Sequence, residues 1–344
     1  MRNLVYCSDG TGQTAADPAS NVYHLVQRLD LAAHHQIHAY APGLGSGPDG
    51  LLGRWFGYGL TREIENAYRF LIRRYQPGDQ IFLFGYSRGA YAMRALTGML
   101  DQVGLLRPEH ADRLSMASDL YTRKALPAER NAFAKRYTQP CPIHFIGAWD
   151  TVASLGYFYA NRRFFNARLT PSVRHARHAL AIHERRPRFE PLLWRTAPLH
   201  ARQTLKQVWF TGSHGDVGGG YARRGLAEIT LQWMLAEAAA QGLALQPDPV
   251  IPQPPNPHAP MHKPWQTWRG KLLRFVFAGN RPREIPAGAQ VHDSVYLRQQ
   301  RDLKMKKQNK PVKRDLPDHA ELRKRTAPLS TPSAVLIRAE RDER

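Results

Sequence analysis

The sequence predicts an α/β protein in which a mostly parallel central sheet carries helices on both faces. Short apolar runs of strand length alternate with segments whose apolar residues recur at helical spacing, and this alternation is typical of that class. The chain has 344 residues, of which 42% are hydrophobic, so it can bury a sizeable core. Parallel neighbours in the sheet are expected to connect through right-handed crossovers.

Each element follows from its local pattern. The predicted strands are apolar runs beside turn residues, at residues 3–7, 37–41, 81–84, 143–149 and 207–210. The predicted helices have helical apolar spacing or are rich in helix-forming residues, at residues 21–29, 61–74, 90–96 and 227–241. A further short strand is expected just before His292.

The most informative motif follows the strand at residues 81–84. Gly85, Ser87 and Gly89 form a G-x-S-x-G pattern between that strand and the next predicted helix. This is the pattern of a nucleophile elbow, in which the glycines allow a turn tight enough to push a serine hydroxyl out of the sheet. It predicts a serine hydrolase with an α/β-hydrolase-like fold. The alternative is a serine that only turns the chain from strand into helix.

An acid and a base are available at two later strand ends. Asp150 follows the strand at residues 143–149, and His214 follows the strand at residues 207–210. Loops at the carboxyl ends of the strands carry function in open α/β sheets. A serine needs a histidine to take its proton and a carboxylate to orient that histidine. The chain order Ser87, Asp150, His214 is the order of α/β-hydrolases, so these three residues are the predicted catalytic triad.

Other assignments remain open at this point. Asp150 could instead close an Asx turn, and His214 could stabilise its glycine-rich loop. His292 is an alternative base because it follows a possible late strand, and Asp216 is an alternative acid.

The oxyanion of the reaction needs backbone donors. One is expected from Arg88, the residue after the nucleophile, and the second from Gly10 or Thr11 in the loop after the first strand. We expect no cofactor, since no Gly-Lys-Ser/Thr follows the glycines of that loop. We also expect no metal, because the chain has no C-x-x-C and its two His-x-x-x-His pairs lack a helical context.

Six motifs in order resemble the catalytic domain of the type VI secretion phospholipase effectors. The resemblance spans roughly residues 1–240, and one departure is His183, where an acidic residue is expected. The matching motifs are CSDGTG at 7–12, YAPGLG at 40–45, FGYSRGA at 84–90, GAWDTVAS at 147–154, HALAIHERR at 178–186 and VWFTGSHGDVGGGY at 208–221.

This resemblance implies an α/β-hydrolase fold with a Ser-Asp-His triad that acts on ester bonds, and for the characterised branch on phospholipid acyl esters. Carried over to this chain, Ser87 is the nucleophile, Asp150 the acid and His214 the base. It also implies export by a type VI secretion system as one fate of the protein. The known effectors are usually longer and carry a membrane-binding module beyond the catalytic domain.

The net charge indicates which partners the protein can attract, and the cysteine count indicates the cellular compartment in which it is made. A net charge of +21 attracts polyanions, and six basic residues with no acid lie in residues 304–314. An anionic membrane surface is therefore an expected partner, and nucleic acid a less favoured one. Cys7 and Cys141 are too few for a disulfide framework. With no signal-peptide pattern and no apolar run of about 18 residues, we expect synthesis in the cytoplasm.

Composition divides the chain into three parts. We expect a catalytic domain at residues 1–245, then a Pro-rich excursion with an aromatic and basic segment at 246–302 that can complete the domain, and a basic tail at 303–344. Eight prolines between residues 246 and 264 mark the excursion. The Arg-rich residues 161–188 are expected to form an insertion beside the active site. Residues 51–60 and 265–277 combine aromatic with basic or glycine residues and could face lipid.

Two function classes follow. The favoured one is a serine hydrolase that cleaves carboxylic esters, with lipid or phospholipid acyl esters as the expected substrate. The alternative is a basic module that binds polyanions, either nucleic acid or an anionic membrane, on a hydrolase-like scaffold.

Overall fold

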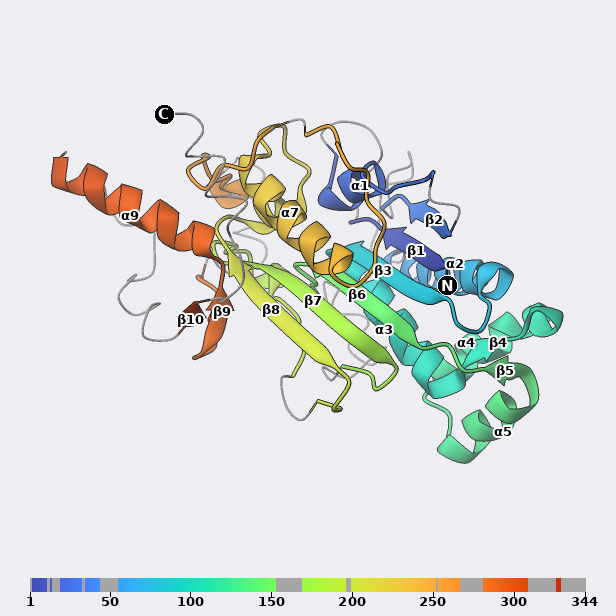
Figure 1. Ribbon diagram of the computed structural model, residues 1–344. Coiled ribbons are helices and arrows are strands. Elements are labelled where there is room, and N and C mark those ends of the chain that lie inside the picture. The colour runs from blue at the N-terminus through green and yellow to red at the C-terminus, as the bar shows by residue number, and fades with distance from the viewer. Residues whose placement is uncertain are drawn as a thin grey trace.

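The computed structural model describes residues 2–10, 13, 19–32, 35–43, 55–152, 169–195, 199–251, 253–266, 281–308 and 326–328. An eight-stranded sheet with the order β10-β9-β8-β7-β6-β3-β1-β2 forms its centre, and all neighbouring strands in it are parallel (Figure 1). The strands are β1 (Asn3–Ser8), β2 (Gln36–Ala41), β3 (Gln80–Tyr86), β6 (Ile143–Trp149), β7 (Val173–Ala181), β8 (Thr204–Phe210), β9 (Ala289–Val291) and β10 (Thr326–Pro328).

Helices cover both faces of this sheet. In Figure 1, α1 and α7 lie on one face and α2 and α3 on the other. The helices are α1 (Asn21–Val26), α2 (Trp55–Arg74), α3 (Arg88–Val103), α4 (Leu114–Thr122), α5 (Pro127–Tyr137), α6 (His214–Gly218), α7 (Gly225–Ala239) and α9 (Asp293–Gln308). A small antiparallel pair, β4 (Leu105–Leu106) with β5 (Thr138–Gln139), brackets α4 and α5. The predicted α/β fold class is confirmed.

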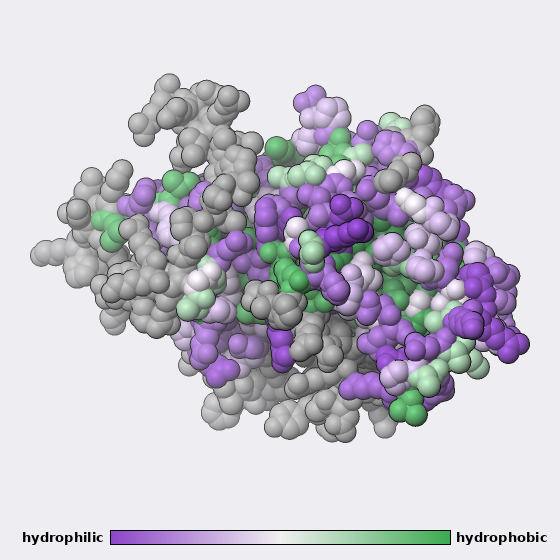
Figure 2. All heavy atoms as spheres, turned by 60° about the horizontal axis from the view of Figure 1, so that its bottom comes forward, coloured by the Kyte–Doolittle hydropathy of each residue, from purple (hydrophilic) through white to green (hydrophobic). Residues whose placement is uncertain are grey.

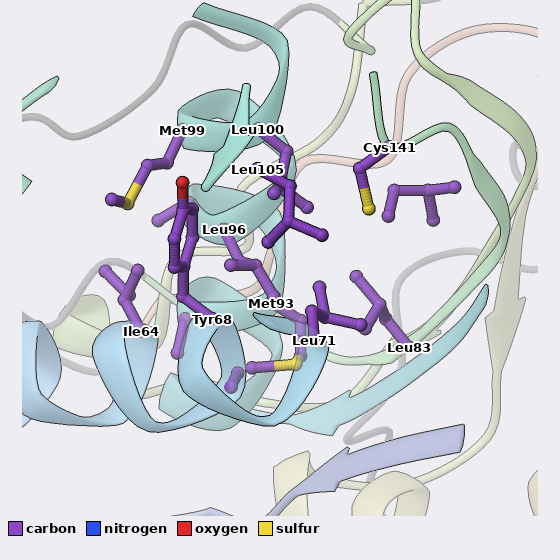
Figure 3. Packing of buried hydrophobic residues seen from close by; sticks show 14 of the residues in the cluster. Ile64, Tyr68, Leu71, Leu83, Met93, Leu96, Met99, Leu100, Leu105 and Cys141 are labelled. Carbon is purple, nitrogen blue, oxygen red and sulfur yellow. The ribbon is translucent and has the colours of Figure 1, made fainter. Parts of the chain in front are cut away.

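The alternation of side chains along β3 divides the core into two layers. Leu83 packs into the cluster under α2 and α3, while Phe82 and Phe84 pack into the cluster under α1 and α7. Successive strand residues point to opposite faces of a sheet, so one apolar run serves both layers. Figure 3 shows the first layer, in which Tyr68 from α2, Leu96 from α3 and Leu83 from β3 belong to one cluster.

One prediction about the sheet is wrong. Residues 161–188 were expected to form an insertion, but residues 173–181 of that stretch are β7, which lies between β6 and β8. Polar residues obscure the strand in the sequence, and the fold satisfies them: Arg177 pairs with Glu237 of α7, and the buried His178 accepts the Thr151 N–H at 3.0 Å.

The segments after residue 245 also contribute to the sheet. β9 comes from residues 246–302 and pairs with β8, and β10 comes from residues 303–344 and pairs with β9. The first five residues of the basic run, 304–308, continue α9, and the rest of the run lies outside the described residues. Residues 51–54 and 267–277 of the two segments expected to face lipid also lie outside them, whereas residues 55–60 begin α2.

Candidate active site

Ser87 stands at the turn between β3 and α3 with φ +55° and ψ −116°. The flanking glycines are required by close approach of backbone. A Cβ on Gly85 would lie 2.5 Å from the Ala90 nitrogen, and a Cβ on Gly89 would lie 2.2 Å from the Ser8 oxygen of β1. The strand, turn and helix therefore have the geometry of the predicted elbow.

The sheet brings the three predicted residues together. β3 and β6 are neighbours, and the Ser87 N–H donates to the Trp149 carbonyl at 2.9 Å, so Asp150 follows directly beside the elbow. His214 begins α6 after β8. Its Nε2 lies 2.8 Å from Ser87 Oγ, and its Nδ1 lies 2.5 Å from Asp150 Oδ2. The result is a continuous hydrogen-bonded chain from hydroxyl through imidazole to carboxylate.

The carboxylate of Asp150 is fully buried and held on several sides. Its Oδ1 accepts the Ala181 N–H at 3.0 Å. Arg283 donates to both carboxylate oxygens, with Nη1 2.6 Å from Oδ1 and Nη2 2.9 Å from Oδ2. Burial alone would raise the pKa of Asp150, but Arg283 and His214 outweigh burial and hold it below its usual range. Asp150 is therefore ionised at neutral pH.

The imidazole of His214 lies between two aromatic rings. Its ring centroid is 4.7 Å from that of Tyr86 and 4.8 Å from that of Phe189. Burial lowers the pKa of His214, although Asp150 and Glu184 oppose that shift. The neutral imidazole is thus favoured, which is the form able to accept a proton from Ser87.

A pocket of about 230 Å³ opens over Ser87 and His214. Two arginines, Arg88 and Arg186, give it positive charge. Arg186 is fixed by the buried Glu184, to which its Nε and Nη2 donate at 2.8 Å each. The remaining lining residues are Gly10, Gln13, Tyr86, Ser87, Phe189, His214, Gly215, Gly219, Gly220 and Tyr221.

The loop after β1 forms one wall of this pocket. Asp9 organises it by accepting hydrogen bonds from Ser20 Oγ at 2.6 Å and from Tyr40 Oη at 2.8 Å. The Gly10 N–H donates to Asp9 Oδ1 at 2.7 Å. This bond occupies the N–H that was expected to bind the oxyanion, so the expectation for Gly10 does not fit the geometry. Thr11, the other expected donor, lies outside the described residues.

The alternative acid and base lie elsewhere. Asp216 caps the N-terminus of α6, where its Oδ2 accepts from Ser213 N at 2.8 Å, and its Oδ1 lies 2.6 Å from Nδ1 of His262. His292 stacks on Phe210 at 4.7 Å, and its Nδ1 lies 2.9 Å from Ser294 Oγ. Neither is among the residues that line the pocket.

Sequence reasoning missed Arg283, Glu184 and Arg186 as parts of the site. Glu184 and Arg186 lie in a stretch expected to border the site, and a signal for them was the acidic residue next to His183. Arg283 lies in an irregular stretch near two prolines, where no periodicity marks it.

Among the described residues, no group of three or more His, Cys, Asp or Glu is placed to hold a metal ion. No helix within those residues is long and apolar enough to cross a membrane.

Two solved structures are similar to part of this chain. A crystal structure of an uncharacterized protein from Pseudomonas aeruginosa is 19% identical with a TM-score of 0.45, over 71% of this chain and 46% of that one. The Tle1 effector bound to the VgrG spike of the type 6 secretion system is 18% identical with a TM-score of 0.38, over 64% of this chain and 51% of that one.

The sequence comparisons are more extensive. The uncharacterized protein YEL023C of Saccharomyces cerevisiae (strain ATCC 204508 / S288c) is 31% identical over 227 residues, which are 57% of this chain and 33% of the yeast protein. This chain thus matches only a third of that relative's length. The family model described as "T6SS, Phospholipase effector Tle1-like, catalytic domain" matches residues 2–237. The chain therefore belongs to the family of Tle1-like catalytic domains of type VI secretion phospholipase effectors.

Proposed function

We propose that this protein is a serine esterase that cleaves phospholipid acyl esters, with Ser87 as nucleophile, His214 as base and Asp150 as the orienting acid. The observation that carries the proposal is the unbroken hydrogen-bonded chain from Ser87 Oγ through His214 to Asp150. It starts at a strained turn beside a pocket. Family membership supports the same reaction class.

The reaction follows from these positions. Ser87 Oγ attacks the ester carbonyl carbon while His214 Nε2 takes the hydroxyl proton, and Asp150 stabilises the imidazolium that forms. The carbonyl oxygen becomes an oxyanion near the first N–H groups of α3, which lack partners within the helix. His214 then returns its proton to the departing alcohol oxygen. Water, activated by the same imidazole, releases the acyl group from Ser87.

The charge of the pocket supports a substrate with an anionic group near the ester. Burial lowers the pKa of the Arg88 guanidinium to about 10, so it still carries its charge at neutral pH. Arg186 lies on the same pocket and pairs with Glu184. Guanidinium groups bind phosphate oxygens well, so we assign the phosphate of the headgroup to this wall.

An anionic membrane surface is the proposed place of action. The net charge of +21 favours approach to anionic lipid. On the face shown in Figure 2, hydrophilic residues predominate among the coloured residues and apolar ones form small separate groups. We further propose synthesis in the cytoplasm followed by export through a type VI secretion system, which family membership supports.

A fluorophosphonate probe tests the nucleophile. The wild-type protein should become labelled, and Ser87→Ala should lose the label while keeping its circular dichroism spectrum. Ser115→Ala is the matched control, because Ser115 is exposed on α4, and it should label like the wild type. A folded wild type that stays unlabelled would exclude the serine mechanism. Salt-sensitive binding of that protein to nucleic acid would then favour the polyanion-binding alternative.

The same proteins test the substrate when fatty acid release is measured from vesicles and from a soluble short-chain ester. Wild type should release fatty acid from anionic phospholipid vesicles, faster than from zwitterionic ones, and Ser87→Ala should release none. If only the soluble ester is cleaved, the protein is an esterase, and the proposal that its substrates are phospholipids is wrong.

A further inference from the structure

Arg283 binds the Asp150 carboxylate, and its Nη2 contacts the same oxygen, Oδ2, that His214 Nδ1 contacts. Besides its two bonds to the carboxylate, its guanidinium donates to the Ala181 carbonyl at 2.8 Å and to the Phe189 carbonyl. Its side chain is only 3% exposed. A buried arginine with four hydrogen bonds is fixed in orientation and fixes whatever it binds.

We infer that Arg283 is a positioning residue of the reaction, which clamps the Asp150 carboxylate and limits how readily the His214–Asp150 pair takes up a proton. This inference rests on the proposed function.

Arg283 makes a bidentate contact with the Asp150 carboxylate. Two parallel N–H···O bonds fix the plane of the Asp150 carboxylate, and with it the direction of the oxygen shared with His214. Arg283 also binds the Phe189 carbonyl, and the Phe189 ring packs edge-on against the His214 ring. The Arg283 guanidinium therefore holds both the carboxylate that accepts from His214 and the aromatic ring that packs against its imidazole.

The charge of Arg283 also affects how readily His214 becomes an imidazolium. The positive charge of Arg283 shares the Asp150 carboxylate with His214 and so opposes a second positive charge on the imidazole. Other groups act on the same ring. Among the described residues, the charged and titratable groups that act on the His214–Asp150 pair include Tyr86 at the end of β3, Glu184 and Arg186 after β7, and Arg283 before β9. His178 of β7 also faces Asp150 and Arg283, and burial keeps it neutral. Removing Arg283 alone leaves a net negative surrounding that favours the protonated pair.

Arg283 also extends the catalytic unit beyond the matched family domain. The match to the family model ends at residue 237, and Arg283 lies after the Pro-rich excursion, shortly before β9. We therefore assign residues 281–291 to the catalytic unit.

The test is the pH dependence of fluorophosphonate labelling in the full-length protein. Arg283→Gln should slow labelling on the order of 10–100-fold, since small misplacements of a catalytic group cost that much. It should also move the acidic limb of the pH profile upward by about one unit. The acidic limb reports protonation of the coupled His214–Asp150 pair, so this shift is expected whether the proton resides on the imidazole or on the carboxylate. Arg281→Gln is the control, because its side chain is 72% exposed, and it should change neither quantity.

Arg283→Lys separates charge from geometry. Lysine keeps the positive charge but cannot make two parallel bonds, so labelling should be slow while the acidic limb stays near that of the wild type. This variant also decides the question if Arg283→Gln does not fold. An unchanged limb in Arg283→Gln, or wild-type labelling in Arg283→Lys, would overturn the inference.

A second readout works without any nucleophilic activity. The downfield proton resonance of His214 Nδ1–H, identified by its loss in His214→Gln, can be titrated by NMR. Its midpoint should rise by about one pH unit in Arg283→Gln and stay constant in Arg281→Gln. If the wild type is not labelled but this shift occurs, the proposed function fails, while the effect of Arg283 on the protonation of the His214–Asp150 pair stands. If the wild type is labelled but the shift does not occur, the proposed function stands and the inference about Arg283 is overturned.

Discussion

Ser87 and Asp150 share an unusual backbone conformation. Among the described non-glycine residues, positive φ occurs at Ser87 (+55°), Lys124 (+54°) and Asp150 (+42°). Such conformations cost on the order of 1–3 kcal/mol each. Two of the three occur where neighbouring strands end at the site, so the sheet holds the strain where it directs the two side chains toward His214.

Arg186 gives a prediction at the same scale. Arg186→Gln should slow hydrolysis of anionic phospholipid vesicles about tenfold more than hydrolysis of a neutral soluble ester, because it removes the charge-assisted bonds to phosphate. The ratio of the two rates, measured on the same variant, cancels any general damage from leaving Glu184 without this partner. Arg174→Gln, exposed near the start of β7, should leave the ratio unchanged. An equal loss on both substrates would argue against phosphate recognition by Arg186.

A single site residue could be predicted from the sequence when it follows a recognisable strand. Ser87, Asp150 and His214 each follow a strongly apolar strand, so chain position alone placed them at one edge of the sheet. Arg283 could not be found in this way, because it contacts Asp150 from 133 residues away and lies in an irregular segment. The orientation of the Gly10 N–H was also beyond prediction, since it depends on the rotamer of Asp9.

The N-terminus of α3 shows how an element depends on one glycine. Gly89→Ala should destabilise the protein by about 1–3 kcal/mol, because overpacking against rigid backbone cannot relax easily. A Cβ there meets the Ser8 and Asp9 oxygens at 2.2 Å and 2.6 Å. Urea denaturation measures the free energy of unfolding, and fluorophosphonate labelling should fall in parallel as α3 moves away from β1.

Gly98→Ala in the same helix is the matched comparison. A Cβ on Gly98 meets the Tyr121 hydroxyl oxygen at 2.6 Å. That atom is the end of a side chain that can shift, and alanine favours a helix by about 1 kcal/mol over glycine. Gly98→Ala should therefore lower the free energy of unfolding by less than Gly89→Ala does, and fluorophosphonate labelling should persist. Equal effects of the two substitutions would contradict the close-approach argument.

Elements with uniform apolar character were predictable and the others were not. The strand at residues 143–149 was predicted with the bounds that β6 has. β7 was missed because buried polar residues such as Arg177 and His178 interrupt its pattern, and only their partners on α7 and after β6 explain their burial. Partners of this kind are distant in sequence, so local periodicity contains no information about them.

The whole molecule should lose stability as the pH falls. Burial lowers the pKa of His178 to about 3 and that of His292 to about 4. An unfolded chain binds protons on these residues below about pH 6.5, whereas the folded chain does not. Because the unfolded state then binds more protons, the free energy of unfolding falls with pH, by up to about 1.4 kcal/mol per unit for each histidine. The loss should extend from about pH 6.5 down to about pH 4 for His292 and about pH 3 for His178.

Thermal denaturation at constant ionic strength measures this slope. His178→Gln should reduce it, since glutamine can still accept the Thr151 N–H but does not titrate. His200→Gln, which changes an exposed residue, should leave the slope as in the wild type. A slope that His178→Gln does not alter would show that other groups cause the acid sensitivity.

The outer end of the sheet beyond β8 has a consequence for self-association. Within the described residues, β9 and β10 are three residues long each, and β10 lies outermost beside β9. An edge strand this short offers a second chain few backbone groups with which to extend the sheet, and short edges are one way in which proteins avoid edge-to-edge aggregation. Pro328 in β10 adds to this protection because it has no N–H to donate. A long parallel sheet can therefore remain open at this edge without recruiting another copy of itself.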